Sequence, residues 1–212
     1  MIDGALEGTM VQVTDRTGGT EPMLDPRLLQ DTLGVALATG GEFAEVFVED
    51  RRSTSAVLDD GRIEELTSGR DRGAGIRVVV GETTGFAHTA DVSQTGLRAA
   101  ATAASAAARG GGAGIRVVAL DAATGPGPAV VEVLPSDVPK ARKVALLARA
   151  DDAARSCDGA ITQVTARYAD SQRRIQIANS DGLLTGDRQI RTLFSVSCVA
   201  SGDSGLQTGR ES

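Results

Sequence analysis

Two different hydrophobic periods occupy separate blocks of this sequence, and their separation limits the fold more than any other feature. Apolar residues recur at helical spacing over residues 24–41, 91–112 and 136–159. The blocks between and after them alternate apolar and polar residues, as strands do. The resulting order is helix, strands, helix, helix, strands. This segregation predicts an α+β domain, with an antiparallel sheet meander and about three helices packed on one face.

Each helical block carries its own start signal. Asp25 precedes Pro26 and is expected to cap the first helix, Asp91 or Ser93 the second, and Ser136 the third. The first buried stripe is expected to contain Leu28, Leu29, Thr32, Val35 and Ala36. The second is expected to contain Leu97, Ala100, Ala101, Ala104 and Ala108, and to stop at Gly110–Gly112. The third is expected to contain Ala141, Val144, Ala145 and Ala148.

The alternating blocks predict short strands joined by turns. Asp60-Gly61 and Asp181-Gly182 are typical of tight hairpins, and another turn is expected within residues 81–85. Residues 125–135 are rich in proline, which predicts a linker with a short edge strand. Residues 1–22 predict a mobile leader, which leaves 23–212 as the folded domain. The ending "SGDSGLQTGRES" suggests a Gly- and Ser-rich run without regular structure.

Composition excludes several classes of function. Aromatic residues are 2% of the chain and the net charge is −6, so the core must be aliphatic. Basic residues never run beyond the pairs Arg51-Arg52 and Arg173-Arg174, which argues against a nucleic-acid partner. The apolar stretches are too short to span a membrane, and a secretion signal is lacking. A cytoplasmic protein with free thiols at Cys157 and Cys198 is expected.

The candidate reactive residues do not form a self-contained active site. His88 is the only histidine and reads as a structural or surface residue. Neighbouring carboxylates on a strand point to opposite faces, so acidic pairs such as Glu49-Asp50 do not predict paired acids. The glycine runs lead into strands and not into helices, which is typical of turns and not of phosphate loops. We therefore expect no catalytic, cofactor-binding or metal residue in this chain.

Several segments carry a resemblance to a known family. They are "AEVFVE", "DGRIEE", "GAGIRVVVGETTGFAHTAD", "IQIANSDG" and the closing "GLQTGRES". Together they resemble the N-terminal half of the TldD/PmbA metallopeptidases, and the ending is more similar to the TldD type. The resemblance implies an assembly and substrate-chamber domain that is inactive alone. It also implies a separate C-terminal domain with zinc on a His-Glu-x-x-x-His helix, which this chain lacks.

The implied partners are that C-terminal domain, a TldD/PmbA-type partner subunit in a homo- or hetero-oligomer, and a peptide substrate. Two other functions remain open. The chain could be a non-catalytic peptide-binding or oligomerisation module that pairs an extended peptide with a sheet edge. It could also be a small-molecule-binding protein that uses residues 73–85, which is the less favoured of the two.

Overall fold

The computed structural model describes residues 12–15, 22–108, 119–123, 131–157 and 160–212. Within these ranges it contains three α-helices, α1 (Pro26–Leu37), α2 (Gln94–Ala107) and α3 (Lys140–Cys157), and the 3₁₀ turn η1 (Pro135–Asp137). The long strands are β2 (Phe43–Asp59), β3 (Arg62–Val80), β6 (Ile161–Asn179) and β7 (Leu183–Gly202). The shorter ones are β1 (Gln12–Asp15), β4 (Thr83–Thr89), β5 (Asp121–Ala122) and β8 (Gly205–Glu211).

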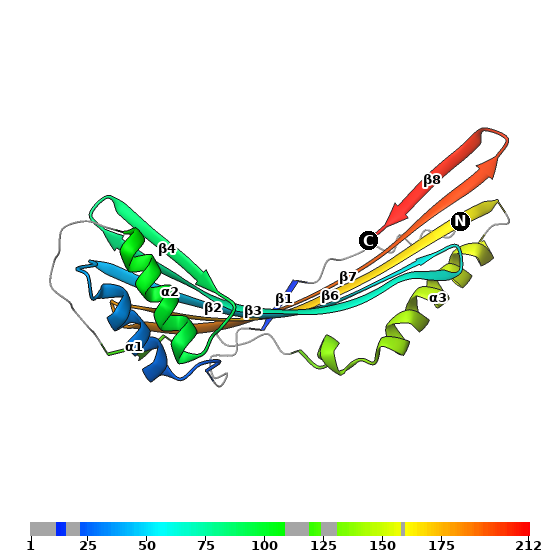
Figure 1. The fold of residues 1–212 in the computed structure, drawn as a ribbon. Coiled ribbons are helices and arrows are strands. Elements are labelled where there is room, and N and C mark those ends of the chain that lie inside the picture. The colour runs from blue at the N-terminus through cyan, green and yellow to red at the C-terminus, as the bar shows by residue number, and fades with distance from the viewer. Residues whose placement is uncertain (1–11, 16–21, 109–118, 124–130, 158–159) are drawn as a thin grey trace.

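These strands form one eight-stranded sheet in the order β1-β7-β6-β2-β3-β4, with β5 and β8 also paired to β7. All pairings are antiparallel except that of the short β5. The four long strands run the length of the sheet, and the hairpin of β7 and β8 projects from one end (Figure 1). The α+β class and the antiparallel meander are therefore confirmed.

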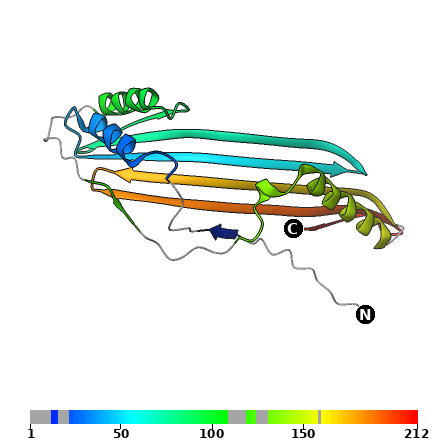
Figure 2. The same cartoon turned by 90° about the horizontal axis from the view of Figure 1, so that it is seen from below.

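All three helices lie on one face of the sheet. Seen from below, α1, α2 and α3 are all in front of the strands, with α1 and α2 at one end and α3 at the other (Figure 2). The burial pattern agrees, because the buried β2 residues Val48, near α1, and Ala56, near α3, share the even positions of one strand. We call this side the helix face and the opposite side the open face.

Two separate hydrophobic clusters hold the helices on the sheet. The larger packs α1 and α2 against β2, β3 and β6, and includes Leu29, Val46, Ile76 and Leu97. The smaller packs Leu147 of α3 against the other ends of β2 and β6. Alanine is common in the α2 stripe, so α2 lies very close to the sheet. A Cβ added at Gly85 of β4 would come within 2.0 Å of the Ala104 carbonyl oxygen.

The start signals of the first two helices are confirmed. The Asp25 carboxylate accepts a hydrogen bond from the Arg27 backbone N–H at 2.8 Å, and Ser93 is the N-cap residue of α2. All five residues expected in the α2 stripe are buried. In α1 the buried residues are Leu29, Thr32, Leu33, Ala36 and Leu37. Leu33 and Leu37 therefore take the places expected for Leu28 and Val35 on the buried face. The expected stop at Gly110–Gly112 lies outside the described residues.

The expectations for the third helix were wrong in two respects. Ser136 lies in η1 and does not cap α3, which begins at Lys140. The buried residues of α3 are Lys143, Leu147 and Asp151, and not the expected alanines and valine. The reason is electrostatic, since Lys143 and Asp151 each have a charged partner that makes their burial tolerable.

The strands are fewer and longer than expected. Short strands were expected, but β2 continues through Arg51-Arg52, β3 through Gly69 and Gly73, and β6 through Asp170. Each central strand is paired along its length, so the ladder hydrogen bonds maintain the extended backbone despite locally weak propensity. The hairpin at Asp60-Gly61 is confirmed, with φ of 46° and 79°.

The two ends of the chain also differ from the expectations. The closing run predicted to lack structure contains β8, which pairs with β7 from Val196 to Gly202. In the 1–22 segment, Gln12–Asp15 forms β1 on β7. The mobility of the leader and the treatment of 23–212 as one domain stay predictions. The linker expected at 125–135 lies partly outside the described residues, and its described end enters η1.

Candidate functional site

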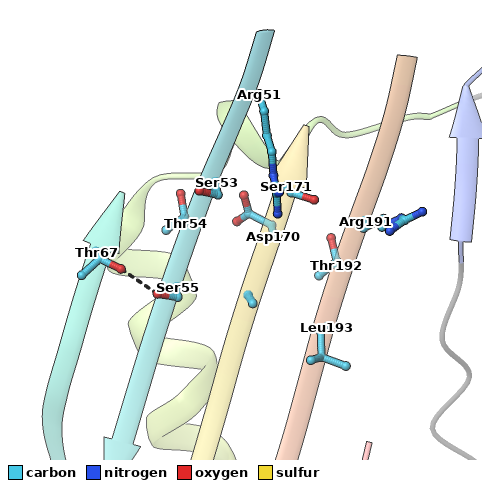
Figure 3. Close-up of a pocket in the computed structure, with 11 residues that line it drawn as sticks. Arg51, Ser53, Thr54, Ser55, Thr67, Asp170, Ser171, Arg191, Thr192 and Leu193 are labelled. Carbon is cyan, nitrogen blue, oxygen red and sulfur yellow. Dashed lines mark hydrogen bonds between the residues drawn. The ribbon is translucent and has the colours of Figure 1, made fainter. Parts of the chain in front are cut away.

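The open face has a hollow at the middle of the sheet. It has a volume of about 280 Å³ and is formed by neighbouring residues of β2, β3, β6 and β7. Figure 3 shows these side chains together, with α3 behind the strands and β1 beside β7. Most of the residues that line it carry a hydroxyl or a guanidinium group, among them Arg51, Ser53, Ser55, Thr67, Ser171 and Arg191.

The strand register brings these residues together from distant parts of the chain. Ser53 of β2 is opposite Ser171 of β6, and Ser171 is opposite Arg191 of β7. The next row along the sheet is Ser55, Ala169 and Leu193. Arg51 is two residues from Ser53 and therefore on the same face. The first row offers hydrogen-bond donors, and the second adds an apolar wall.

Two other arginines of the open face are neutralised by carboxylates of the chain. Arg77 pairs with Glu45 at 3.4 Å and lies over the Phe43 ring. Arg173 pairs with Glu49 at 2.6 Å and lies over the Phe47 ring. In contrast, the side chains of Arg51 and Arg191 form no hydrogen bond or ion pair with any of the described residues. The hollow therefore presents two guanidinium groups without a carboxylate partner in the part of the chain that the structure describes.

A buried charged cluster lies on the helix face behind this hollow. The Lys143 Nζ of α3 is 2.5 Å from the Asp170 Oδ2 of β6, with side chains only 4% and 6% exposed. The same Nζ is 5.4 Å from the centre of the Tyr168 ring. Burial, with a hydrogen bond to Asp170, raises the pKa of the Tyr168 hydroxyl well above its ordinary value. A second hollow of about 250 Å³ lies beside this cluster, and Asp170 contributes to both hollows.

The acidic pair Glu49-Asp50 behaves as strand geometry requires. Glu49 pairs with Arg173 on the open face, whereas Asp50 pairs with Arg70 on the helix face at 2.5 Å. The hydrogen bonds from the Arg70 guanidinium hold the pKa of the Asp50 carboxyl below its ordinary value. These two neighbouring carboxylates therefore cannot act as a pair on one substrate.

The other residues considered in the sequence are far apart in the fold. His88 is exposed on β4, and its ring is 6.4 Å from that of Phe86. Cys157 is exposed at the end of α3, Cys198 is half-buried on β7, and both are free thiols. Among the described residues, no group of three His, Cys, Asp or Glu side chains could hold a metal ion. The described residues therefore do not fit a metal centre.

Two glycines within residues 73–85 allow close packing of the backbone. A Cβ at Gly73 would lie 2.8 Å from the Thr89 carbonyl oxygen, and one at Gly85 would collide with α2. Both glycines are in strands, so no helix N-terminus points at a ligand there. This geometry supports the interpretation of the first glycine run as structural, and the second run, at residues 110–114, lies outside the described residues.

Sequence reasoning missed the residues that the structure brings together. Arg51 was noticed only as part of a basic pair, and Arg191, Lys143 and Asp170 were not singled out. The only local signal for the hollow was the polar stretch "RRSTS" inside an otherwise alternating strand. Its partners on β6 and β7 are more than 100 residues away, so only the register could identify them.

Solved structures share this fold over most of the chain. A putative modulator of DNA gyrase from Bacteroides thetaiotaomicron aligns with a TM-score of 0.69 and 17% identity, covering 87% of this chain and 43% of that one. TldE from Thermococcus kodakarensis aligns with a TM-score of 0.67 and 14% identity, covering 87% and 42%. At these identities the likeness defines the fold alone. The chain therefore has the same class of fold as these proteins, an α+β fold with a long antiparallel sheet.

The sequence comparisons identify the family within this class. Residues 44–108 match PmbA/TldA metallopeptidase domain 1, and residues 134–212 match the PmbA/TldA metallopeptidase central domain. The chain belongs to the TldD/PmbA family. The strands of the two matched regions pair directly in one sheet, since β2 of the first pairs with β6 of the second.

Curated relatives support this assignment and show how much of them the chain covers. A metalloprotease from Methanothermobacter thermautotrophicus is 33% identical over 179 residues, which are 81% of this chain and 37% of the relative. A metalloprotease TldD homolog from Haemophilus influenzae is 28% identical over 159 residues, 74% of this chain and 33% of the relative. The chain thus spans about a third of the length of these relatives. None of the described helices combines the length and apolar character needed to cross a bilayer.

Proposed function

We propose that this chain forms the assembly and substrate-chamber part of a TldD/PmbA-type zinc metallopeptidase that acts on peptides or unfolded protein segments. The observation that carries the proposal is the sheet with one face covered by helices and the other open and hollowed, in a chain that matches the first and central domains of this family. An open sheet face formed by four long strands is suited to form one wall of a chamber. The zinc would be held by residues outside those described here.

The described surface supports an assembly role. The β7–β8 hairpin projects from the sheet, and Leu206 at its tip is 73% exposed. Among the described strands, β3 from Arg62 to Gly73 is paired only with β2, so its outer edge presents unpaired backbone groups. Exposed apolar side chains and an unpaired edge together favour association with a partner. The proposed partners are the C-terminal domain and a TldD/PmbA-type subunit, within a cytoplasmic homo- or hetero-oligomer.

Co-purification with a metal-bearing TldD/PmbA-type subunit tests this proposal. We expect the chain alone to hold no tightly bound zinc and to cleave no unfolded peptide, and to be captured by that subunit at micromolar concentration. Leu206→Asp should weaken capture about tenfold, because it places a charge in an apolar contact. The neighbouring Thr208→Asp adds the same charge on the same face of β8 without removing an apolar side chain. A strict monomer that no subunit captures would refute the assembly role.

The β3 edge favours a second candidate function, a non-catalytic peptide-binding module. Its twelve-residue segment Arg62–Gly73 could accept an extended peptide as an additional antiparallel or parallel strand. This candidate predicts peptide binding by the isolated chain at the edge, without any metal-dependent cleavage after assembly. Measuring cleavage by the assembled complex therefore separates the two functions.

A further inference from the structure

We infer that the open-face hollow is a binding site for a carboxylate carried by an extended peptide. This inference deepens the peptide-handling role proposed above and rests on it. The hollow combines unpartnered cationic groups, free hydroxyl donors and an apolar wall in one place on the sheet.

The cationic groups are Arg51 and Arg191. Arg70, Arg77, Arg155 and Arg173 each pair with a carboxylate of the chain, whereas these two have no ion-pair partner among the described residues. Asp71 is opposite Arg51 in the β2–β3 register, yet the two do not form an ion pair. Arginine is well suited to carboxylate recognition because its planar guanidinium can donate two parallel hydrogen bonds.

The donors lie within reach of one ligand. Ser53, Ser171 and Arg191 share one row across three strands, so about 10 Å separates the first from the last at ordinary strand spacing. The Arg51 side chain extends from β2 toward Ser171 of β6, whereas the Arg191 side chain points from β7 toward β1, at the rim of the hollow (Figure 3). The Ser53 and Ser171 hydroxyls have no partner among the described residues. Arg51 is therefore the central anchor, and Arg191 is the outer one.

The same wall already binds a carboxylate of this chain. At the β3 side of the hollow, Glu65 Oε1 accepts hydrogen bonds from the Ser55 and Thr67 hydroxyls at 3.0 and 3.1 Å. In the row of Ser55, Ala169 and Leu193, the Ser55 hydroxyl is therefore already hydrogen-bonded, and the other two side chains are apolar. Leu193 is 40% exposed and can contact the aliphatic part of a ligand. This apolar wall favours a peptide carboxylate over a free inorganic anion.

The inference is tested with three fluorescently labelled ten-residue peptides of alternating Ser and Val. One carries a central Glu and an amidated C-terminus, the second a central Gln and a free C-terminal carboxylate, and the third a central Gln and an amidated C-terminus. Fluorescence anisotropy with the full chain should show at least tenfold tighter binding of one carboxylate peptide than of the third. Which of the first two binds identifies the source of the carboxylate.

The variants locate the site. Arg51→Gln should weaken binding of the preferred peptide about tenfold, Arg191→Gln about threefold, and higher salt should weaken it further. Arg98→Gln on α2 removes the same charge away from the hollow and should leave the affinity unchanged. All variants should retain the wild-type circular dichroism spectrum, because these side chains are exposed.

Three results would overturn the inference. They are equal binding of all three peptides, an equal loss in Arg98→Gln, or binding of inorganic phosphate without binding of either carboxylate peptide. Capture by the metal-bearing subunit is measured on the same variants. Lost carboxylate selectivity with intact capture would remove this inference alone, whereas lost capture with retained selectivity would remove only the assembly role.

Discussion

Replacing Lys143 by methionine should destabilise this protein more than any change to a surface charge. Methionine keeps an unbranched side chain of similar length, so the packing of α3 on β6 is largely preserved. What the substitution removes is the ammonium group that neutralises Asp170. The carboxylate is then left buried on the helix face without its cation.

The magnitude follows from the burial of the pair. Both side chains are less than a tenth exposed and their charged atoms are 2.5 Å apart. Removing one partner of such a pair costs about 3–5 kcal/mol, mostly because the other charge remains buried. With a urea m-value of about 2–3 kcal/mol/M, the unfolding midpoint should fall by about 1–2.5 M. Lys140→Met, at an exposed position one turn earlier in α3, should change the free energy of unfolding by at most about 0.5 kcal/mol.

Urea unfolding followed by circular dichroism measures these differences. The double variant Lys143→Met with Asp170→Asn removes both charges, so its loss should be smaller than the sum of the two single losses by more than about 1.5 kcal/mol. A loss below about 1 kcal/mol in Lys143→Met, or strict additivity in the double variant, would show that the two charges are not buried as a pair. The reasoning about α3 would then be refuted.

Three further predictions concern titration, packing and thiols. Because the fold raises the pKa of the Tyr168 hydroxyl, the contribution of this group to stability is complete below its ordinary pKa of about 10 and is lost as the pH rises beyond that value. Urea unfolding between pH 8 and 11 should therefore show a smaller alkaline loss of unfolding free energy in Tyr168→Phe than in the wild type. An equal loss in the two proteins would contradict this. Gly85→Ala drives a methyl group into the backbone of α2 and should cost at least about 1–3 kcal/mol in thermal unfolding, whereas Gly209→Ala, where the added Cβ meets no atom within 4 Å, should cost less than 1 kcal/mol. Thiol titration should find two reactive groups per denatured, unreduced chain, with Cys157 labelled faster than Cys198 in the native state, and a disulfide in freshly prepared protein would be the opposing result.

Helix starts, turns and buried helix faces could be predicted from the sequence where a short segment determines its own conformation. Asp25-Pro26 predicts the start of α1, and Asp60-Gly61 predicts the hairpin between β2 and β3. The alanine stripe of α2 was also correct at every position. These signals succeed because capping, left-handed turn geometry and helical spacing involve residues only a few positions apart.

The strand boundaries and the face of α3 could not be predicted in the same way. Gly69 and Gly73 weaken a strand locally, but β3 continues through them because β2 supplies its hydrogen bonds along the whole length. The sequence gives no sign that Lys143 is buried, because lysine is usually a surface residue. Its burial is tolerated only because Asp170 of β6 forms an ion pair with it. Propensity is a local quantity, whereas these outcomes depend on partners that are distant in the chain.

The sequence by itself determined the order of the elements, the aliphatic core and the family, since each depends on composition, local pattern or matched segments. The tertiary structure alone decided that one sheet joins the two family domains and that Arg51 and Arg191 line one hollow. A strand pattern states which residues share a face but not which strand lies beside it. That choice is made by the register of long-range pairing, in which Ser53 meets Ser171 across more than 100 residues.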